Sequence, residues 1–190
     1  NRALSVARQA NKHELKYNDT DQSALTGFVG PAGTYLWATC TELIQGNASN
    51  RRVGNVIDAT SINLRGVIEY NPLSATSNQL CRIIVFQNLN SGVPSAVTDY
   101  LQSLNFNSHK SIDNRFNTAT IFDKVYEVSA DHTLRSLNLD LKLKKKMIPY
   151  GNSPAAPEKN NISILAISSE PITLQGPIVY GQVRMFFHDR

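Results

Sequence analysis

Strict alternation of apolar and polar residues is the feature that most restricts how this chain can fold. In residues 55–70, NVIDATSINLRGVIEY, the apolar positions Ile62, Leu64 and Ile68 recur with a period of two. Residues 136–148, SLNLDLKLKKKMI, place leucines at alternate positions. A period of two is that of a β-strand with one buried face, whereas an amphipathic helix repeats about every 3.6 residues. The chain is therefore expected to consist mainly of long, half-buried strands.

Six other segments carry strand patterns and are separated by turn-rich connections. They are residues 13–25, 34–44, 79–88, 117–129, 162–169 and 178–189. The segment 79–88 is apolar on both faces, which suits a strand in the middle of a sandwich sheet. We expect Gly66, inside the longest alternating run, to mark a bulge or a close backbone approach. About eight strands in 190 residues predict a single all-β sandwich or barrel.

Two segments have helical spacing instead. In residues 3–12, ALSVARQANK, the basic residues Arg8 and Lys12 lie four positions apart, and Lys16 follows at the same interval. They would form one basic stripe if a helix continued that far. Downstream of Pro94, the i, i+3, i+4, i+7 spacing is shown by Val97, Tyr100, Leu101 and Leu104. The sequence therefore predicts a short N-terminal helix and one short helix between strands.

The chain carries no motif that predicts catalysis or a bound cofactor. It has neither a phosphate-binding loop, nor a GxSxG nucleophile elbow, nor an HExxH pair. The histidines are scattered, and no residue spacing predicts a metal site. Cys40 and Cys81 each lie in an apolar run, which favours buried free thiols, although a disulfide stays open. No apolar run approaches the roughly 20 residues of a membrane span, so no membrane partner is expected.

Positive charge is the more informative chemical feature. The net charge is +4, which permits but does not require an acidic partner such as nucleic acid. Clusters of basic side chains can neutralise phosphates. The candidate nucleic-acid-binding residues are Arg2, Arg8, Lys12, Lys16, Arg51 and Arg52. Lys142, Lys144, Lys145 and Lys146 are interpreted either as a further basic cluster or as protection of an edge strand against pairing with another chain.

Residues 43–71, LIQGNASNRRVGNVIDATSINLRGVIEYN, resemble a characteristic segment of small single-jelly-roll viral capsid proteins. That family includes the capsids of circular single-stranded DNA viruses that encode a replication initiator protein, and the coat proteins of satellite tobacco necrosis viruses. The matching residues, in order, are Gln45, Gly46, Arg52, Gly54, Ile57, Ile62, Leu64, Arg65 and Gly66. The segments 85–105 and 178–189 resemble later parts of the same family, so the likeness extends over most of the chain.

This resemblance implies an all-β, eight-stranded single jelly-roll sandwich. Residues 1–16 would be the remnant of a basic N-terminal helix or arm, and residues 17–190 the capsid domain. Sixty copies would form the smallest icosahedral (T=1) shell and package viral single-stranded nucleic acid, expected to be circular single-stranded DNA, with RNA left open. The resemblance places such a protein in the virion and, for a DNA virus, in the host nucleus during assembly. It does not identify a host receptor.

Two other functions are alternatives to that of a shell protein. A carbohydrate-binding β-sandwich that forms no shell is the main alternative, since lectin domains share the jelly roll. A jelly-roll enzyme is disfavoured by the absence of a paired His and Glu metal pattern. Within the capsid interpretation, one of Arg51 and Arg52 is expected to hold the turn by bonding carbonyls or a carboxylate. The other is expected to face the lumen or a neighbouring subunit.

Overall fold

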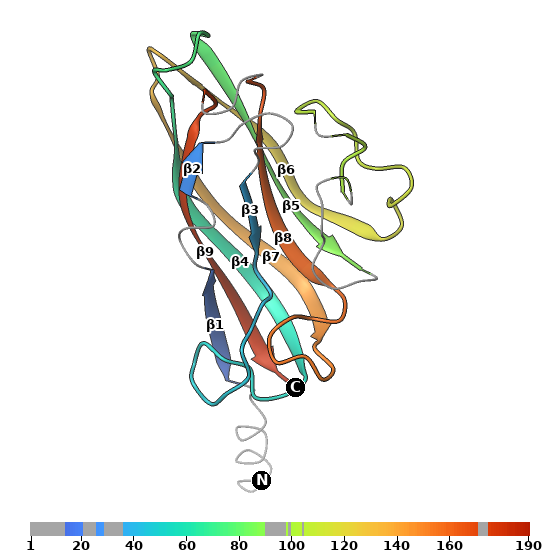
Figure 1. Ribbon diagram of the computed structural model, residues 1–190. Coiled ribbons are helices and arrows are strands. Elements are labelled where there is room, and N and C mark those ends of the chain that lie inside the picture. Colours follow the sequence, from blue (N-terminus) through green and yellow to red (C-terminus); the bar gives the residue numbers. More distant parts are fainter. Residues whose placement is uncertain are drawn as a thin grey trace, which may run out of the picture.

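The computed structural model describes residues 14–20, 26–28, 36–89, 98, 100–103, 105–170 and 175–190. The described residues form nine strands, which are labelled in Figure 1. Their bounds are β1 Leu15–Thr20, β2 Thr26–Phe28, β3 Leu36–Thr39, β4 Val56–Glu69, β5 Asn78–Asn88, β6 Thr118–Ser129, β7 Leu134–Pro149, β8 Asn161–Ser168 and β9 Ile178–Asp189. Every segment expected to be a strand contains one.

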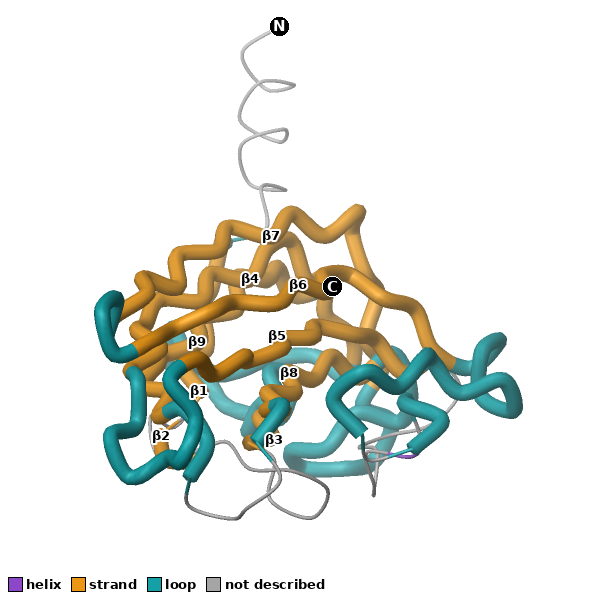
Figure 2. Tube along the Cα trace, turned by 90° about the horizontal axis from the view of Figure 1, so that it is seen from above, coloured by secondary structure: helices purple, strands orange, loops and turns teal. Residues whose placement is uncertain are grey.

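The strands form two antiparallel sheets that pack face to face, as Figure 2 shows from one end of the sandwich. Sheet A has the order β1-β9-β4-β7, with β2 also paired to β9, and sheet B has the order β3-β8-β5-β6. This is the strand order of a jelly roll, so the expected fold class is confirmed. The ninth strand arises because the first jelly-roll strand is in two pieces. Strand β1 ends opposite Val183 and β2 begins opposite Tyr180, both along β9.

The alternating runs bury the faces that their sequences predict. In β4, Ile62, Leu64 and Ile68 are almost completely inaccessible to solvent and belong to the core between the sheets. In β7, Leu137 and Leu143 are buried in the same core, and the two leucines between them pack against it. The inner faces of both sheets supply this core, as the two-layer arrangement of a sandwich requires.

Gly66 marks a close approach of two backbones. A Cβ atom built on Gly66 would lie 2.8 Å from the Gly181 Cα of β9, and nearer still to the carbonyl oxygen of Tyr180. The expected close approach is therefore confirmed. The bulge lies elsewhere in β4, at Thr60, where the pairing shifts between Ala59 and Ser61 toward both neighbouring strands.

A second, smaller hydrophobic cluster covers the outer face of sheet B. Side chains of the connection between β5 and β6 pack there on the strands, and Tyr100 stacks on Phe86 with ring centroids 4.3 Å apart. Strand β5 is thus buried on both faces, as expected.

In the described part of the helix expected around Val97–Leu104, only Thr98 has a helical conformation, and it is 3₁₀. Leu101 forms a β-bridge with Lys110, and Tyr100 lies in a turn. Tyr100 and Leu101, the described apolar residues of that segment, cover the outer face of sheet B. The helix expected at residues 3–12 lies outside the described residues. Within the described part of the chain, no helix is long and apolar enough to cross a membrane.

Both cysteines are buried free thiols. Burial raises the pKa of Cys40 and of Cys81 to about 12. The backbone of Cys40 bonds to Ile162 near one end of β8, whereas Cys81 pairs with Ser168 at the other end. Since a strand rises about 3.3 Å per residue, the two thiols are too far apart for the disulfide that the sequence left open.

Candidate nucleic-acid interface

The turn between β3 and β4, residues 43–55, lies at the end of the sandwich where β1 begins and β9 ends (Figure 1). Backbone groups of this turn form hydrogen bonds with one another. Gly46 donates to the carbonyl of Arg52 at 2.8 Å, Arg51 donates to Ala48 at 2.9 Å, and Gln45 and Arg52 form an isolated bridge. The Gln45 amide adds a bond from Nε2 to the Val53 carbonyl at 3.1 Å. The polar stretch is therefore an ordered, internally bonded turn.

Arg52 is completely buried at the base of this turn. Its guanidinium donates to three backbone carbonyls: Nε to Leu43 at 3.2 Å, Nη1 to Gly54 at 2.6 Å and Nη2 to Ser153 at 2.6 Å. The group also lies over the ring of Tyr150, 4.2 Å from its centroid. The charge is thus stabilised by carbonyl dipoles and an aromatic face. This is the arginine that holds the turn, and its donors are directed into the protein.

Tyr150 completes the contact beneath Arg52. Burial raises the pKa of the Tyr150 phenol, and the charge of Arg52 opposes that rise only in part. The phenol therefore stays protonated at neutral pH and donates to the carbonyl of Thr41 at 2.7 Å. Arg52 and Tyr150 together join the 43–55 turn to the connection between β7 and β8.

Lys16 lies in strand β1, on the side of that strand that faces the core. It is 5% exposed, and its ammonium bonds Asp189 Oδ2 at 2.8 Å and the Arg51 carbonyl at 3.2 Å. The other carboxylate oxygen of Asp189 accepts from the amide of Val53 at 3.1 Å. Lys16 and Asp189 therefore connect β1, β9 and the turn. Lys16 belongs to a strand and not to the helical basic stripe that its spacing suggested.

Arg51 differs from both of these residues. Its side chain is exposed, and among the described residues its guanidinium has no hydrogen-bond or ion-pair partner. Arg2, Arg8 and Lys12 lie outside the described residues. Of the six candidate residues, the structure thus brings Lys16, Arg51 and Arg52 to one end of the sandwich, and it leaves Arg51 as the one of these three that is open to a phosphate.

Two further residues of the sequence signature have structural tasks, Gly54 in the turn and Arg65 farther along β4. A Cβ atom on Gly54 would lie 2.8 Å from the carbonyl oxygen of Arg190, so only glycine lets the last residue pass this closely. Arg65 leaves β4 on the outer face of sheet A and bonds Asp140 of β7 at 2.5 Å. The signature therefore specifies how the turn and the neighbouring strands fit together.

The remaining cations of the outer face of sheet A are mostly paired. Arg184 bonds Asp19 at 2.6 Å, and Arg190 bonds Asp58 at 2.7 Å. Lys142 and Lys144 of the edge strand β7 are exposed, and the side chains of the two lysines that follow lie outside the described residues. The outer face of sheet A thus carries both positive and negative side chains, and its unpaired positive charge lies along the β7 edge.

Sequence reasoning missed the partners that neutralise or enclose these cations. Asp189, Ser153 and Tyr150 lie about a hundred residues or more from the turn, and no local pattern indicates such contacts. No group of three or more His, Cys, Asp or Glu side chains that could hold a metal occurs within the described residues.

No family model matches the chain, and no curated protein matches it. Two viral structures are similar over 94% of the chain. The infectious bursal disease virus VP2 subviral particle is 11% identical with a TM-score of 0.32. The VP1 of Trichodysplasia spinulosa-associated polyomavirus, in complex with sialylated glycooligomers, is 10% identical with a TM-score of 0.33. The chain spans 33% of the first of these proteins and 94% of the second. At such values the likeness identifies no family, and the fold assignment rests on the strand order.

Proposed function

We propose that this chain is a viral capsid protein that assembles into a small closed shell around single-stranded nucleic acid. The observation that carries the proposal is the jelly-roll strand order together with the 43–55 turn. The turn's Gln45, Arg52 and Gly54 match the capsid segment and interlock in the structure. Jelly rolls also occur in lectins and cupins, but that turn is the part of the chain that resembles capsid proteins in particular.

Exposed apolar side chains at several places support contacts with further copies. At the end that bears the turn, Leu15, Ile44 and Val53 are each more than half exposed, and at the opposite end Leu73 and Leu134 are more exposed still. Ile112 and Phe116 project from the connection between β5 and β6. A single exposed apolar residue is ordinary, but groups of them mark interaction surfaces. A closed symmetric shell needs such surfaces on several sides of each copy.

The first test of this proposal is assembly. We expect the purified protein to elute as large particles and to appear as uniform shells in electron micrographs. We also expect at least one of the single variants Ile44→Asp, Leu134→Asp and Phe116→Asp to yield a folded monomer or small oligomer, because a carboxylate buried in a subunit contact is costly. Asn47→Asp adds the same charge at an exposed polar position and should leave the particles intact.

A full-length protein that stays a monodisperse monomer at low and at high salt would refute the shell. If that monomer bound glycans, the carbohydrate-binding alternative would replace it. Circular dichroism of each variant separates lost assembly from lost folding.

The second test concerns packaging. We propose that Arg2, Arg8, Lys12 and Arg51 neutralise phosphates, whereas Lys16 and Arg52 position the turn that carries Arg51. The triple variant Arg2→Gln/Arg8→Gln/Lys12→Gln and the single variant Arg51→Gln should each lower the ratio of absorbance at 260 nm to that at 280 nm in purified particles, since fewer phosphates are neutralised. Lys124→Gln removes one charge from the edge strand β6 of sheet B, where the Lys124 ammonium lies over the Tyr126 ring, and should leave the ratio unchanged. An unchanged ratio in all variants would assign the binding to other residues, with Lys142 and Lys144 the first to test.

A further inference from the structure

Strand β7 forms one edge of sheet A, and its free side is the longest unpaired edge in the described part of the chain. The strand contains 16 residues, and β4 is the strand beside it. From Leu134 to Lys142 it pairs with β4 in an unbroken register, which shifts only beyond Lys142. A regular edge of this kind carries a row of backbone N–H and C=O groups that can pair with another strand.

The core beneath this edge is incompletely covered. Leu139 and Leu141 lie opposite Leu64 and Ile62 of β4, on the row that faces the core. The two β4 residues are at most 1% exposed, whereas both leucines of β7 are only partly buried. Their apolar surface is therefore open along the free side of β7, where a further strand would remove it from water.

The outer row of the same segment is polar and has unused hydrogen-bonding capacity. Ser136, Asn138, Asp140 and Lys142 are all exposed. Asp140 binds Arg65 through Oδ1. Its Oδ2 has no donor among the described residues, and the Asn138 amide and the Lys142 ammonium have no partner there either. This row can thus both donate and accept hydrogen bonds, and its two charges are of opposite sign.

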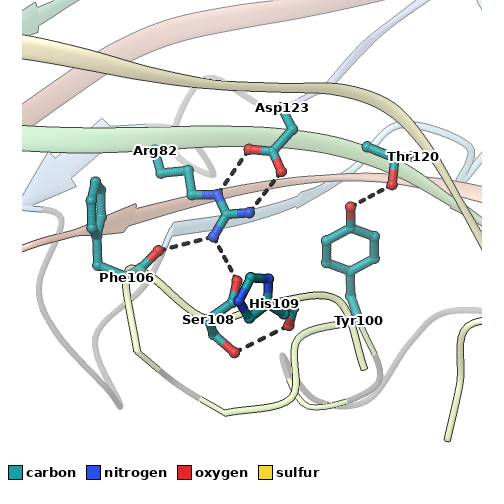
Figure 3. Close-up of polar contacts among 7 residues, drawn as sticks. All are labelled: Arg82, Tyr100, Phe106, Ser108, His109, Thr120 and Asp123. Atoms are coloured by element: carbon teal, nitrogen blue, oxygen red, sulfur yellow. Dashed lines mark hydrogen bonds and ion pairs between the residues drawn. The ribbon is translucent and has the colours of Figure 1, made fainter. Parts of the chain in front are cut away.

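Strand β6, the edge of sheet B, is not suited to pairing with the same strand of a second copy. A bulge at Ile121 interrupts its register. On its outer side, Asp123 is bound to Arg82 by two parallel bonds of 2.8 and 2.7 Å, as Figure 3 shows. Pairing about Val125 would also bring Asp123 opposite Glu127 of the second copy, and like charges directly opposite destabilise a strand pair. Sheet A therefore offers the better edge.

We propose that β7 of one copy pairs antiparallel with β7 of a second copy, about a twofold axis at Leu139. Sheet A then continues across both copies, and the core-facing rows of the two strands meet on one side. On that side Leu137 lies opposite Leu141 of the second copy, and Leu139 lies opposite its own equivalent. Residues directly opposite have Cβ atoms about 4.5–5.5 Å apart, so the partly buried leucines become covered.

On the outer side, the polar residues meet in complementary pairs, each of which occurs twice. Asn138 lies opposite Asp140 of the second copy, and its amide donates to the free Oδ2. Lys142 lies opposite Ser136 of the second copy, and its ammonium donates to the serine hydroxyl. The pairing therefore gives a partner to each polar side chain of the row and brings no like charges together.

Other positions of the twofold axis fit less well. An axis at Asp140 would place this carboxylate opposite its own equivalent. An axis at Leu141 would extend the pairing into residues 143–145, where the register with β4 shifts. An axis at Asn138 would place the Lys142 ammonium opposite a leucine. The axis at Leu139 alone combines a regular backbone with complementary side chains.

The contact is isologous, since both copies use the same strand. It requires only two copies, so it does not depend on the proposed shell, in which it would provide the twofold contact. Lys144, Lys145 and Lys146 follow the paired segment. Their like charges restrict pairing to the residues that precede them, because charge at an edge opposes further strand addition.

Cysteine cross-linking of the purified protein tests the pairing and its register. Asn138→Cys and Asp140→Cys each place two equivalent thiols diagonally across the axis, about 7–8 Å apart, and a short bifunctional maleimide should join most chains into covalent dimers. Ser136→Cys and Lys142→Cys place the thiols six residues out of register, about 20 Å apart, and should yield few dimers. The two native thiols are buried, with pKa values raised to about 12, so they stay unreactive.

Charge placement gives a second test. Asn138→Asp places a carboxylate opposite Asp140 of the second copy, twice in each dimer, and should raise the protein concentration at half-association about tenfold. The double variant Asn138→Asp/Asp140→Asn again has one acid opposite one amide and should restore the original value, with Arg65 still opposite position 138. Ser136→Asp adds the same charge opposite Lys142 and should not weaken association. Analytical ultracentrifugation measures the unaltered protein and the three variants.

Absence of covalent dimers at positions 138 and 140, or equal yields at all four positions, would overturn the edge pairing. So would a double variant that associates as weakly as Asn138→Asp does. Particles that form without these cross-links would refute the edge pairing and leave the shell proposal standing. Cross-linked dimers that never form particles would support the pairing and refute the shell. Circular dichroism confirms that each variant is folded.

Discussion

Replacing Arg52 with alanine is expected to lower the melting temperature by about 6–12 °C. The change leaves three carbonyl acceptors, those of Leu43, Gly54 and Ser153, without their donor. Each unsatisfied buried group costs about 1–3 kcal/mol, so a total near 3 kcal/mol is a conservative expectation. The variant also opens a cavity over the Tyr150 ring, since Arg52 is among the largest fully buried side chains.

The neighbouring arginine provides the matched control. Arg51→Ala removes the same charge one residue away, from an exposed side chain, and should change the free energy of unfolding by less than about 0.5 kcal/mol. Arg52→Lys keeps the charge but has one nitrogen where guanidinium has three, so it should recover only part of the loss. Thermal unfolding followed by circular dichroism measures all three variants. Equal melting temperatures for Arg51→Ala and Arg52→Ala would show that the buried bonds do not stabilise the turn.

Gly66→Val is expected to destabilise the protein by about 3 kcal/mol or more, through overpacking between two backbones. The new Cβ would meet the Tyr180 carbonyl oxygen and the Gly181 Cα of β9, and neither can move without displacing the strand. The backbone of Gly66 is not in the left-handed region, so the clash rather than conformational strain causes the loss. Gly66→Ala should cost about 1–3 kcal/mol for the same reason.

Gly46→Ala tests whether the loss in free energy of unfolding depends on the rigidity of the group that the added Cβ meets. There the added Cβ would lie 2.7 Å from Cδ of the Arg51 side chain, which is exposed and can rotate away. We expect a loss below about 1 kcal/mol. Urea unfolding of the three glycine variants orders them. A Gly46→Ala loss as large as that of Gly66→Ala would contradict the explanation.

The strands were predictable from the sequence because the alternation within each segment is enough to mark its buried face. In β4 and β7 the alternation itself states which side chains face the core, and Ile62, Leu64 and Leu137 follow it. Leu101 shows where such reasoning fails. Its helical spacing from Val97 and Leu104 is real, but the outer face of sheet B offers a second apolar surface, and a bridge to Lys110 competes with helical hydrogen bonds. Tertiary packing decides between a helix and the bridged conformation that packs on sheet B.

The polar turn was predictable from the sequence, but the separate structural roles of its two arginines were not. Adjacent arginines in a polar turn indicated that one would hold the turn. Which one does so depends on the carbonyl of Ser153, which lies 101 residues away in sequence. Lys16 shows the same limit, since its spacing from Lys12 matches a helix while its long-range partner Asp189 fixes it in a strand.

The antiparallel pairing of β1 with β9 has a practical consequence. The start of β1 and the end of β9 lie together, with the His188 ring 3.2 Å from the carbonyl of Glu14. The hairpin between β6 and β7 lies at the opposite pole, where Tyr70 bonds the carbonyl of Thr133. Residues 130–133 of that hairpin are exposed. A foreign peptide inserted there would project away from anything fused to either strand end, which makes this hairpin the position of choice for using the protein as a display scaffold.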